Sequence, residues 1–298
     1  MSRAEPFDIE NRPVQVGAGP IRLHGTVQWP GRRESRPPRC RDGGPRPTVV
    51  VCHGFKGFME WGFFPPLADL LVERGFTVIR FNFSGNGMRP GDDLVTDLEA
   101  FRGSTFSQDL ADLLRILAAA GTEIAPDHVD PDHLALLGHS RGGGAALLAA
   151  AHPDWRDRLR ALVTWSAVST FDRFGEEAKE IWRRGEDVPI ANARTGQELP
   201  LGRETLDDVE CHREELDLHA AAGRRSAPWL IVHGGDDETV PSAEAESLEG
   251  AAAGLCELRL VAGASHTFGA QHPFAGPTPQ LIEAMNATQT WLRRHLCG

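Results

Sequence analysis

The feature that most constrains this chain is a regular alternation, from residue 48 onward, between short apolar runs and stretches with helical periodicity. The first run, TVVVCH at residues 48–53, is rich in β-branched residues, which is typical of a strand buried on both faces. Further runs predict strands at 77–83, 134–138, 159–166, 229–234 and 258–263. Helices are predicted at 63–75, 104–121, 141–151 and about 279–296. This alternation predicts an α/β fold of three layers, in which helices cover both faces of a mostly parallel central sheet.

The length of 298 residues suits one large domain, and we expect residues 1–298 to form it. Segments at 30–47 and 170–225 depart from the alternation of strands and helices. Residues 21–29 alternate as a half-exposed strand does. Residues 30–47 hold five prolines and six arginines, which predicts an exposed, flexible loop. Residues 170–225 hold 23 charged residues, 14 of them acidic, and no strand-like run. Because an insertion between parallel strands lies above the ligand-binding edge of the sheet, we expect a lid or cap there; a peripheral decoration is the alternative.

Charge, hydropathy and cysteine spacing exclude several classes of protein. The net charge of −11 argues against a nucleic-acid-binding protein, whose phosphate contacts need a basic face. The sequence contains no run of 18 apolar residues, so no membrane-spanning helix is expected. The first 16 residues lack the apolar core of a secretory signal. The five cysteines are widely spaced and form no CxxC or Cys/His pattern. We therefore expect reduced thiols, a cytoplasmic location and no bound metal.

The pentapeptide Gly138-His139-Ser140-Arg141-Gly142 is the single G-x-S-x-G match in the sequence. It follows the predicted strand 134–138 and opens the predicted helix 141–151, which is the strand–turn–helix context that a serine nucleophile of this type requires. A sharp turn there brings backbone atoms so close that only glycine is tolerated. We therefore expect the hydroxyl of Ser140 to stand clear of the sheet as a nucleophile.

A serine hydroxyl needs a base to take its proton, and the base needs a carboxylate to orient it. His266 follows the last predicted strand and is our candidate for the base, with His272 as the alternative. The stretch HGGDDETVP at residues 233–241 supplies Asp236 and Asp237 at the end of the strand before it. The chain order of serine, carboxylate and histidine is the one expected for this architecture.

The tetrahedral intermediate of such a reaction also needs N–H donors directed at its oxyanion. One donor is expected from the backbone of Arg141, directly after the nucleophile. The other is expected from the loop after the strand at 48–53, where His53-Gly54-Phe55-Lys56-Gly57 predicts a tight backbone turn. We assign this second donor to the backbone of Phe55.

These features together resemble those of the α/β-hydrolase superfamily over roughly residues 48–298. Within it, the chain is similar to the cinnamoyl/feruloyl-esterase-like branch, which grades into the serine aminopeptidase-like hydrolases. The stretches that carry this similarity are HGFKGF, FNFSGNG, GHSRGG, HGGDDETVP and GASH. The resemblance implies that Asp237 rather than Asp236 is the catalytic acid and that Phe55 and Arg141 are the oxyanion donors. Relatives often carry glutamine where Arg141 stands, which leaves the role of its side chain open.

The expected function is that of a serine hydrolase that cleaves carboxylic esters of small acyl or aromatic acids through an acyl-enzyme, with no cofactor. A serine peptidase or amidase and a thioesterase or acyl transferase use the same triad and stay as alternatives. From another class, a non-catalytic binding scaffold on the same fold is the third alternative. Aromatic residues at 55–64 adjoin the oxyanion loop and could line an acyl pocket, although helix packing explains Phe63 and Phe64 equally well. The sequence does not identify the substrate-binding residues or the oligomeric state.

Overall fold

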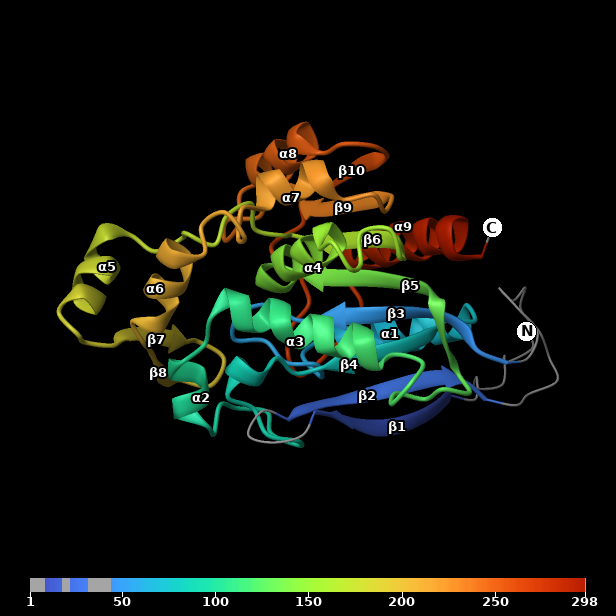
Figure 1. The fold of residues 1–298 in the computed structure, drawn as a ribbon, viewed down its shortest axis with the longest axis horizontal. Coiled ribbons are helices and arrows are strands. Elements are labelled where there is room, and N and C mark those ends of the chain that lie inside the picture. Colours follow the sequence, from blue (N-terminus) through green and yellow to red (C-terminus); the bar gives the residue numbers. More distant parts are fainter. Residues whose placement is uncertain (1–8, 18–21, 32–43, 298) are drawn as a thin grey trace.

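The computed structural model describes residues 9–17, 22–31 and 44–297, and a large sheet runs through the centre of this part of the chain (Figure 1). Its eight strands in the described residues are β1 (Ile9–Val16), β2 (Leu23–Pro30), β3 (Arg46–Cys52), β4 (Thr77–Phe81), β5 (Val129–His139), β6 (Leu159–Trp165), β9 (Trp229–Gly234) and β10 (Cys256–Val261). Their order across the sheet is β1-β2-β4-β3-β5-β6-β9-β10. β2 is antiparallel to both of its neighbours, whereas the strands from β4 to β10 are all parallel. The prediction of a mostly parallel sheet is confirmed.

Helices cover both faces of this sheet and give the expected three layers (Figure 1). One face packs against α1 (Phe64–Glu73) and α9 (Pro279–Leu296), and the other against α3 (Phe106–Ala119), α4 (Arg141–Ala151), α7 (Leu218–Arg224) and α8 (Ser242–Ala251). The alternation of side chains along a strand divides the core in the same way. In β3, Val49 and Val51 belong to the cluster under α1 and α9, and Val50 belongs to the cluster under α3 and α4.

The interval 170–225 corrects the sequence-based expectation that it contains no strand. It holds a hairpin of two antiparallel strands, β7 (Val188–Asn192) and β8 (Gln197–Leu201), between α5 (Glu176–Arg183) and α6 (Glu204–Cys211). These strands escaped prediction because each is short and contains a proline, and because their apolar residues are buried by distant parts of the chain. Trp182, Leu199 and Leu201 form a separate small core with Val95 and Phe101.

The end of the same interval belongs to the main body of the protein. Helix α7 packs against α4 and α8, with Leu218, Ala221 and Ala222 buried in the core under that face of the sheet. The separate substructure is therefore shorter than the predicted insertion and comprises α5, the hairpin and α6. Most of the predicted flexible loop at residues 30–47 lies outside the described residues.

The cysteines and the hydropathy of the helices test two further expectations. Cys52, Cys211 and Cys256 are free thiols, as predicted, and burial raises the pKa of the Cys52 thiol. The expectation of reduced thiols is wrong at Cys297, which is disulfide-bonded. Within the described residues, none of the helices combines the length and apolar character needed to cross a membrane.

Candidate active site

Ser140 stands at the sharp turn between β5 and α4, at the carboxyl edge of the sheet. Its backbone has φ of 55° and ψ of −124°, a conformation that costs a residue with a side chain about 1–3 kcal/mol. The Ser140 N–H donates a hydrogen bond of 2.9 Å to the carbonyl of Trp165 at the end of β6, which fixes the turn to the neighbouring strand. Strain of this kind, held in place by the surrounding sheet, is typical of functional positions.

Glycines on both sides of the serine allow the turn to pack tightly. A Cβ on Gly138 would lie 2.2 Å from the carbonyl oxygen of Gly142, and a Cβ on Gly142 would lie 2.2 Å from that of His53. Gly54, in the loop after β3, approaches from the other side, and a Cβ there would lie 3.0 Å from the Cβ of Ser140. The glycines therefore bring the Ser140 turn and the loop at residues 53–57, the candidate oxyanion loop, into direct contact.

His266 and Asp237 are joined by a hydrogen bond of 2.8 Å from Nδ1 of the histidine to Oδ2 of the carboxylate. The other oxygen of Asp237 accepts the N–H groups of Thr239 and Val240, both at 2.9 Å. Burial raises the pKa of Asp237, but the hydrogen bonds from His266 and Val240 outweigh it and lower the pKa to about 2. Asp237 is therefore an anion at neutral pH and orients the His266 ring.

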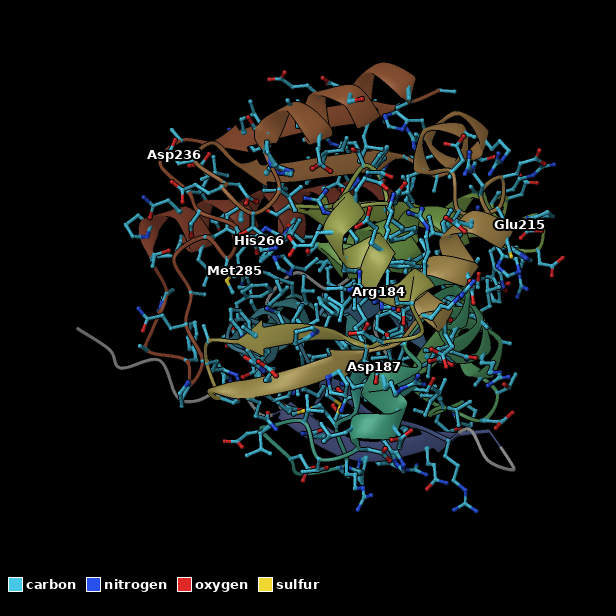
Figure 2. All side chains as sticks on the ribbon, turned by 90° about the vertical axis from the view of Figure 1, so that its left-hand side faces the viewer. Arg184, Asp187, Glu215, Asp236, His266 and Met285 are labelled. Atoms are coloured by element: carbon cyan, nitrogen blue, oxygen red, sulfur yellow. The ribbon has the colours of Figure 1, made fainter. Side chains whose placement is uncertain are left out.

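The neighbouring carboxylate points elsewhere. Asp236 is exposed, and its backbone N–H donates to the carbonyl of Ala264. In Figure 2 its side chain lies at the rim of the molecule, whereas His266 lies closer to the centre of the view. The geometry thus brings Asp237, and not Asp236, to the histidine.

His139, the residue before Ser140, connects the nucleophile turn to the histidine. Its Nε2 lies 2.9 Å from the backbone oxygen of His266, and the two rings are 4.7 Å apart. Because the partner is a carbonyl, Nε2 of His139 must carry the proton. Within the described residues no hydrogen bond joins the hydroxyl of Ser140 to the His266 ring, and the hydrogen bond of His139 ties the Ser140 turn to the backbone of His266.

The ring of His139 is deeply buried, and this has a consequence for stability. Burial, with a smaller contribution from the neighbouring His266, lowers the pKa of His139 to about 3, while that of an unfolded chain is near 6.5. The unfolded chain therefore binds a proton more readily than the folded one between these values. The contribution of the neutral His139 ring to the free energy of unfolding is complete above pH 6.5 and is lost as the pH falls from 6.5 toward 3.

We expect His139→Gln to reduce the acid sensitivity of the fold. At pH 5 the buried ring of His139 costs roughly 2 kcal/mol of stability relative to pH 7. A glutamine amide can still donate to the carbonyl of His266 but does not titrate. Denaturant unfolding of both proteins at pH 7 and pH 5 should show that the variant loses about 2 kcal/mol less than the wild type. An equal loss in the two proteins would refute the assignment of a buried neutral ring.

The oxyanion loop forms a compact turn after β3. The N–H of Gly57 and Nδ1–H of His53 donate to the carbonyl of Gly54, at 3.0 and 2.9 Å. In the described part of the chain, the backbone N–H groups of Phe55 and Arg141 donate no hydrogen bond. Two unpaired donors beside the Ser140 turn are what an oxyanion site requires.

The side chain of Arg141 packs against residues of α3 and of the segment before it. Its Nε donates to Asp109 at 2.5 Å, and a terminal nitrogen donates to the Ser104 hydroxyl and the Thr105 carbonyl, both at 2.9 Å. The guanidinium also lies 4.3 Å from the centre of the Phe106 ring. The Arg141 side chain, whose role the sequence left open, anchors α4 to α3.

Asp109 is a member of this anchor that the sequence analysis missed. Burial raises the pKa of Asp109 to about 6, against the opposing effect of Arg141. The pair is separated by 32 positions and is brought together by the packing of α3 on α4. The one available signal in the sequence was an aspartate, Asp109, on the apolar face of the predicted helix 104–121, where an acidic side chain needs a buried partner.

The other histidines near the site have structural contacts. The N–H of Gly62 donates to Nδ1 of His272 at 3.0 Å, and the His272 ring packs against Phe58 at 5.0 Å. His233 contacts the carbonyl of Val240 through Nε2 at 2.8 Å. His272, the alternative base, is thus not brought to Asp237. Among the described residues, no cluster of His, Cys, Asp and Glu is arranged to hold a metal ion.

The class of protein follows from the fold and from a family model. The model of the alpha/beta hydrolase fold matches residues 47–199, a range that includes nearly all of β3, the Ser140 turn and about half of the insertion. The chain belongs to this family, and membership supports a hydrolase as the general activity.

Two curated relatives resemble the chain at the level of sequence. A dihydrolipoyllysine-residue acetyltransferase component of an acetoin cleaving system, from Cupriavidus necator, is 25% identical over 285 residues, which cover 87% of this chain and 66% of that protein. An uncharacterized protein of Mycobacterium tuberculosis is 29% identical over 225 residues, which cover 75% of this chain and 64% of that protein. The chain thus spans slightly less than two thirds of the length of either relative.

Two solved structures share the fold over nearly the whole chain. Est1E from Butyrivibrio proteoclasticus with ferulic acid bound has a TM-score of 0.66 at 21% identity, and covers 96% of this chain and 100% of its own. A putative hydrolase from Agrobacterium vitis S4 has a TM-score of 0.71 at 20% identity, and covers 96% of this chain and 99% of its own. At these identities the similarity establishes the fold alone.

Proposed function

We propose that the protein is a serine hydrolase that cleaves carboxylic esters of small acyl or aromatic acids. The observation that carries this proposal is the Nδ1–Oδ2 hydrogen bond between His266 and Asp237, placed beside the strained turn of Ser140. An ionised carboxylate that holds one histidine nitrogen leaves the other nitrogen to accept a proton. The unpaired N–H groups of Phe55 and Arg141 provide the oxyanion site.

The reaction proceeds through an acyl-enzyme. His266 takes the hydroxyl proton of Ser140 as the serine oxygen bonds to the ester carbonyl carbon, and the carbonyl oxygen becomes an oxyanion held by the N–H groups of Phe55 and Arg141. The intermediate collapses when the C–O bond to the alcohol breaks, and His266 gives its proton to the departing oxygen. Water, deprotonated by His266, then attacks the acyl-enzyme, and the acid leaves as Ser140 regains its proton.

A lid over this site is part of the proposal. The substructure of α5, β7, β8 and α6 contacts the oxyanion loop, since Nζ of Lys56 donates to the carbonyl of Ala191 at 3.0 Å and Phe55 packs against its small core. The choice of aromatic acids draws on the ferulic acid bound to Est1E and on the aromatic residues Phe58 and Trp61 beside this loop. We propose that the lid and the remaining residues of 1–298 act as one domain.

Acyl transfer is the second candidate, and a specific observation favours it. The relative from Cupriavidus necator is described as an acetyltransferase component, and the same acyl-enzyme can pass its acyl group to a thiol instead of water. A peptidase or amidase would use the same triad, and a binding scaffold would use none of it. A cytoplasmic location stays a prediction, which the three free thiols favour and the disulfide at Cys297 opposes.

A panel of substrates tests the proposed reaction. We expect p-nitrophenyl acetate and methyl cinnamates to be hydrolysed with a higher kcat/KM than aminoacyl p-nitroanilides and acyl thioesters. The acyl group should go to water in each case, and added dithiols should not compete with it. Faster cleavage of the anilides would contradict the esterase assignment in favour of a peptidase. Preferential transfer of the acyl group to a dithiol would favour the acyltransferase.

A further inference from the structure

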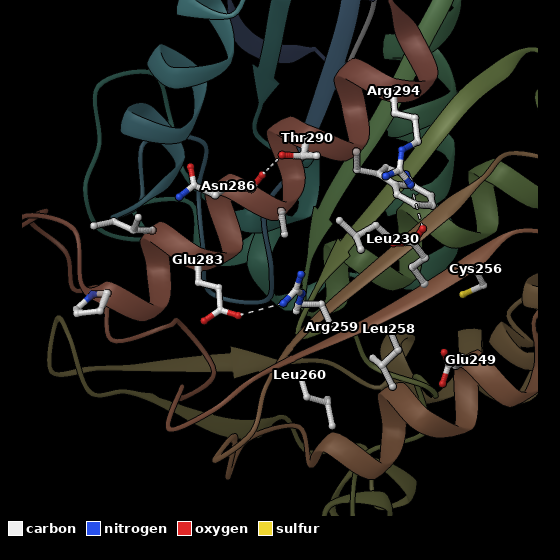
Figure 3. Close-up of a pocket in the computed structure, with 15 residues that line it drawn as sticks. Leu230, Glu249, Cys256, Leu258, Arg259, Leu260, Glu283, Asn286, Thr290 and Arg294 are labelled. Atoms are coloured by element: carbon white, nitrogen blue, oxygen red, sulfur yellow. Dashed lines mark hydrogen bonds and ion pairs between the residues drawn. The ribbon is translucent and has the colours of Figure 1, made fainter. Parts of the chain in front are cut away.

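The last strand of the sheet, β10, has an open edge with an unusual surface. In the described residues β10 pairs with β9 on one side, and the sheet ends on the other. Five large apolar side chains are exposed in the described part of the chain, and three of them, Leu255, Leu260 and Ile282, lie at this edge. Leu260 and Ile282 belong to a groove along this edge, lined by residues of β10, α9 and α8 (Figure 3). Apolar exposure gathered along a sheet edge indicates a surface that another chain covers.

The direction of the hydrogen bonds shows which residues this edge offers. The N–H of Trp229 donates to the carbonyl of Leu255 at 3.0 Å, and that of Gly235 donates to the carbonyl of Val261 at 2.8 Å. Polar backbone groups alternate between the two sides of a strand, so residues 255, 257, 259 and 261 are bonded to β9. The N–H and C=O groups of Cys256, Leu258 and Leu260 therefore point to the open edge.

We propose that a second copy of this chain covers the edge, with the two β10 strands paired antiparallel about a two-fold axis at Leu258. In this register Leu258 lies opposite Leu258 of the partner subunit, and Cys256 lies opposite Leu260 of the partner subunit. These are hydrogen-bonded pairs, because their backbone groups point outward. Glu257 then lies opposite Arg259 of the partner subunit in a non-hydrogen-bonded pair, where side chains approach most closely.

Charge selects this register among those that the backbone allows. Outward-facing residues can pair only with outward-facing residues, so the axis must pass through a residue of the strand. An axis at Glu257 would place two glutamates opposite each other, and an axis at Arg259 would place two arginines opposite each other. Like charges in opposite positions destabilise a sheet. With the axis at Leu258, Glu257 of each subunit lies opposite Arg259 of the other, so opposite charges are paired at two places.

On the face of β10 that carries Glu257 and Arg259, both side chains form ion pairs with α9. Glu257 lies 3.1 Å from Arg294, and Arg259 lies 3.6 Å from Glu283, the second contact being visible in Figure 3. Across the two-fold axis, each Glu257–Arg294 pair meets an Arg259–Glu283 pair, which gives two neutral clusters of four charges. On the opposite face of the strand, Leu258 and Leu260 bury each other's apolar surface. A self-complementary patch of this kind is what a two-fold interface requires.

Two charge reversals test the proposal when they are studied separately and mixed. Sedimentation velocity at about 100 μM protein should show a wild-type dimer, since an interface of micromolar Kd is then filled. Glu257→Arg places arginine opposite arginine, and Arg259→Glu places glutamate opposite glutamate, so each variant alone should be a monomer. In an equimolar mixture, every contact across the axis is again between opposite charges, and a heterodimer should form.

The mixing experiment distinguishes the loss of contacts between the two chains from the loss of ion pairs within one chain. Each variant loses an ion pair with α9, and mixing does not restore it, so recovery of the dimer can come only from contacts between chains. Arg203→Glu, which breaks an exposed ion pair of 3.1 Å with Asp207 on α6, is the matched control and should stay dimeric. Circular dichroism verifies that all variants are folded. A monomeric wild type, a dimer that survives both reversals or a mixture that stays monomeric would each overturn the proposal.

Discussion

Ser140→Ala is expected to lower the kcat for p-nitrophenyl ester hydrolysis on the order of 10⁶-fold, with little change in KM. In the proposed mechanism the hydroxyl oxygen forms the bond to the acyl carbon, and neither the methyl group of alanine nor the proposed oxyanion donors can replace it. Steady-state kinetics with freshly purified protein measure the effect, and titration of active sites excludes a contaminating wild-type enzyme. A variant that retains activity within tenfold of the wild type would reject Ser140 as the nucleophile.

Stability measurements on the same position separate loss of chemistry from loss of fold. Alanine has the same difficulty as serine with φ of 55°, so Ser140→Ala should unfold at nearly the wild-type denaturant concentration. Glycine relieves the strain, and Ser140→Gly should be more stable by about 1 kcal/mol while equally inactive. Denaturant unfolding followed by tryptophan fluorescence gives both values. Equal stability of the alanine and glycine variants would mean that the turn is not strained.

Asp237→Asn is expected to lower kcat about 10⁴-fold, the second largest effect. The asparagine amide can donate to Nδ1 of His266, which would place the histidine proton on the nitrogen that must accept the serine proton. Because asparagine keeps an oxygen that can accept the N–H groups of Thr239 and Val240, the loop should keep its conformation. The kcat for the same ester, compared at one pH, measures the effect.

The adjacent carboxylate provides a matched control for this substitution. Asp236→Asn removes the same charge one residue away, from an exposed side chain that does not contact His266. Its kcat should stay within about twofold of the wild type, since surface substitutions away from special features have small effects. Similar losses of kcat in the two variants would indicate a general effect of charge. A larger loss of kcat in Asp236→Asn would make Asp236 the catalytic acid.

The sequence predicted those parts of the fold that local pattern determines. The buried parallel strand β3 has a continuous β-branched run, and its predicted bounds are correct to within two residues. β5 begins five residues before its predicted start, because its first part, residues 129–133, carries polar residues and a proline. The edge strand β1 was missed because its sequence, IENRPVQV, mixes charge and proline and alternates poorly. The hairpin in the insertion was missed because Leu199 and Leu201 are buried by Val95 and Phe101, about a hundred positions earlier in the chain.

The candidate site was predictable for a similar reason. Ser140, Asp237 and His266 each follow a strand of the parallel sheet, and the carboxyl ends of such strands meet at one edge. The supporting contacts were not predictable, since they depend on how helices pack. The ion pair of Arg141 with Asp109 is an example, because nothing in the sequence around either residue indicates its partner.

A fluorophosphonate probe gives the most direct test of the central claim, that Ser140 is a nucleophile activated by His266 and Asp237. We expect one phosphonate adduct per chain, located by mass spectrometry of the digested protein on the peptide that contains Ser140. The adduct should be absent from Ser140→Ala and should form much more slowly in Asp237→Asn than in Asp236→Asn. An adduct on a different serine, or no adduct on a preparation that hydrolyses esters, would show that Ser140 is not the activated nucleophile.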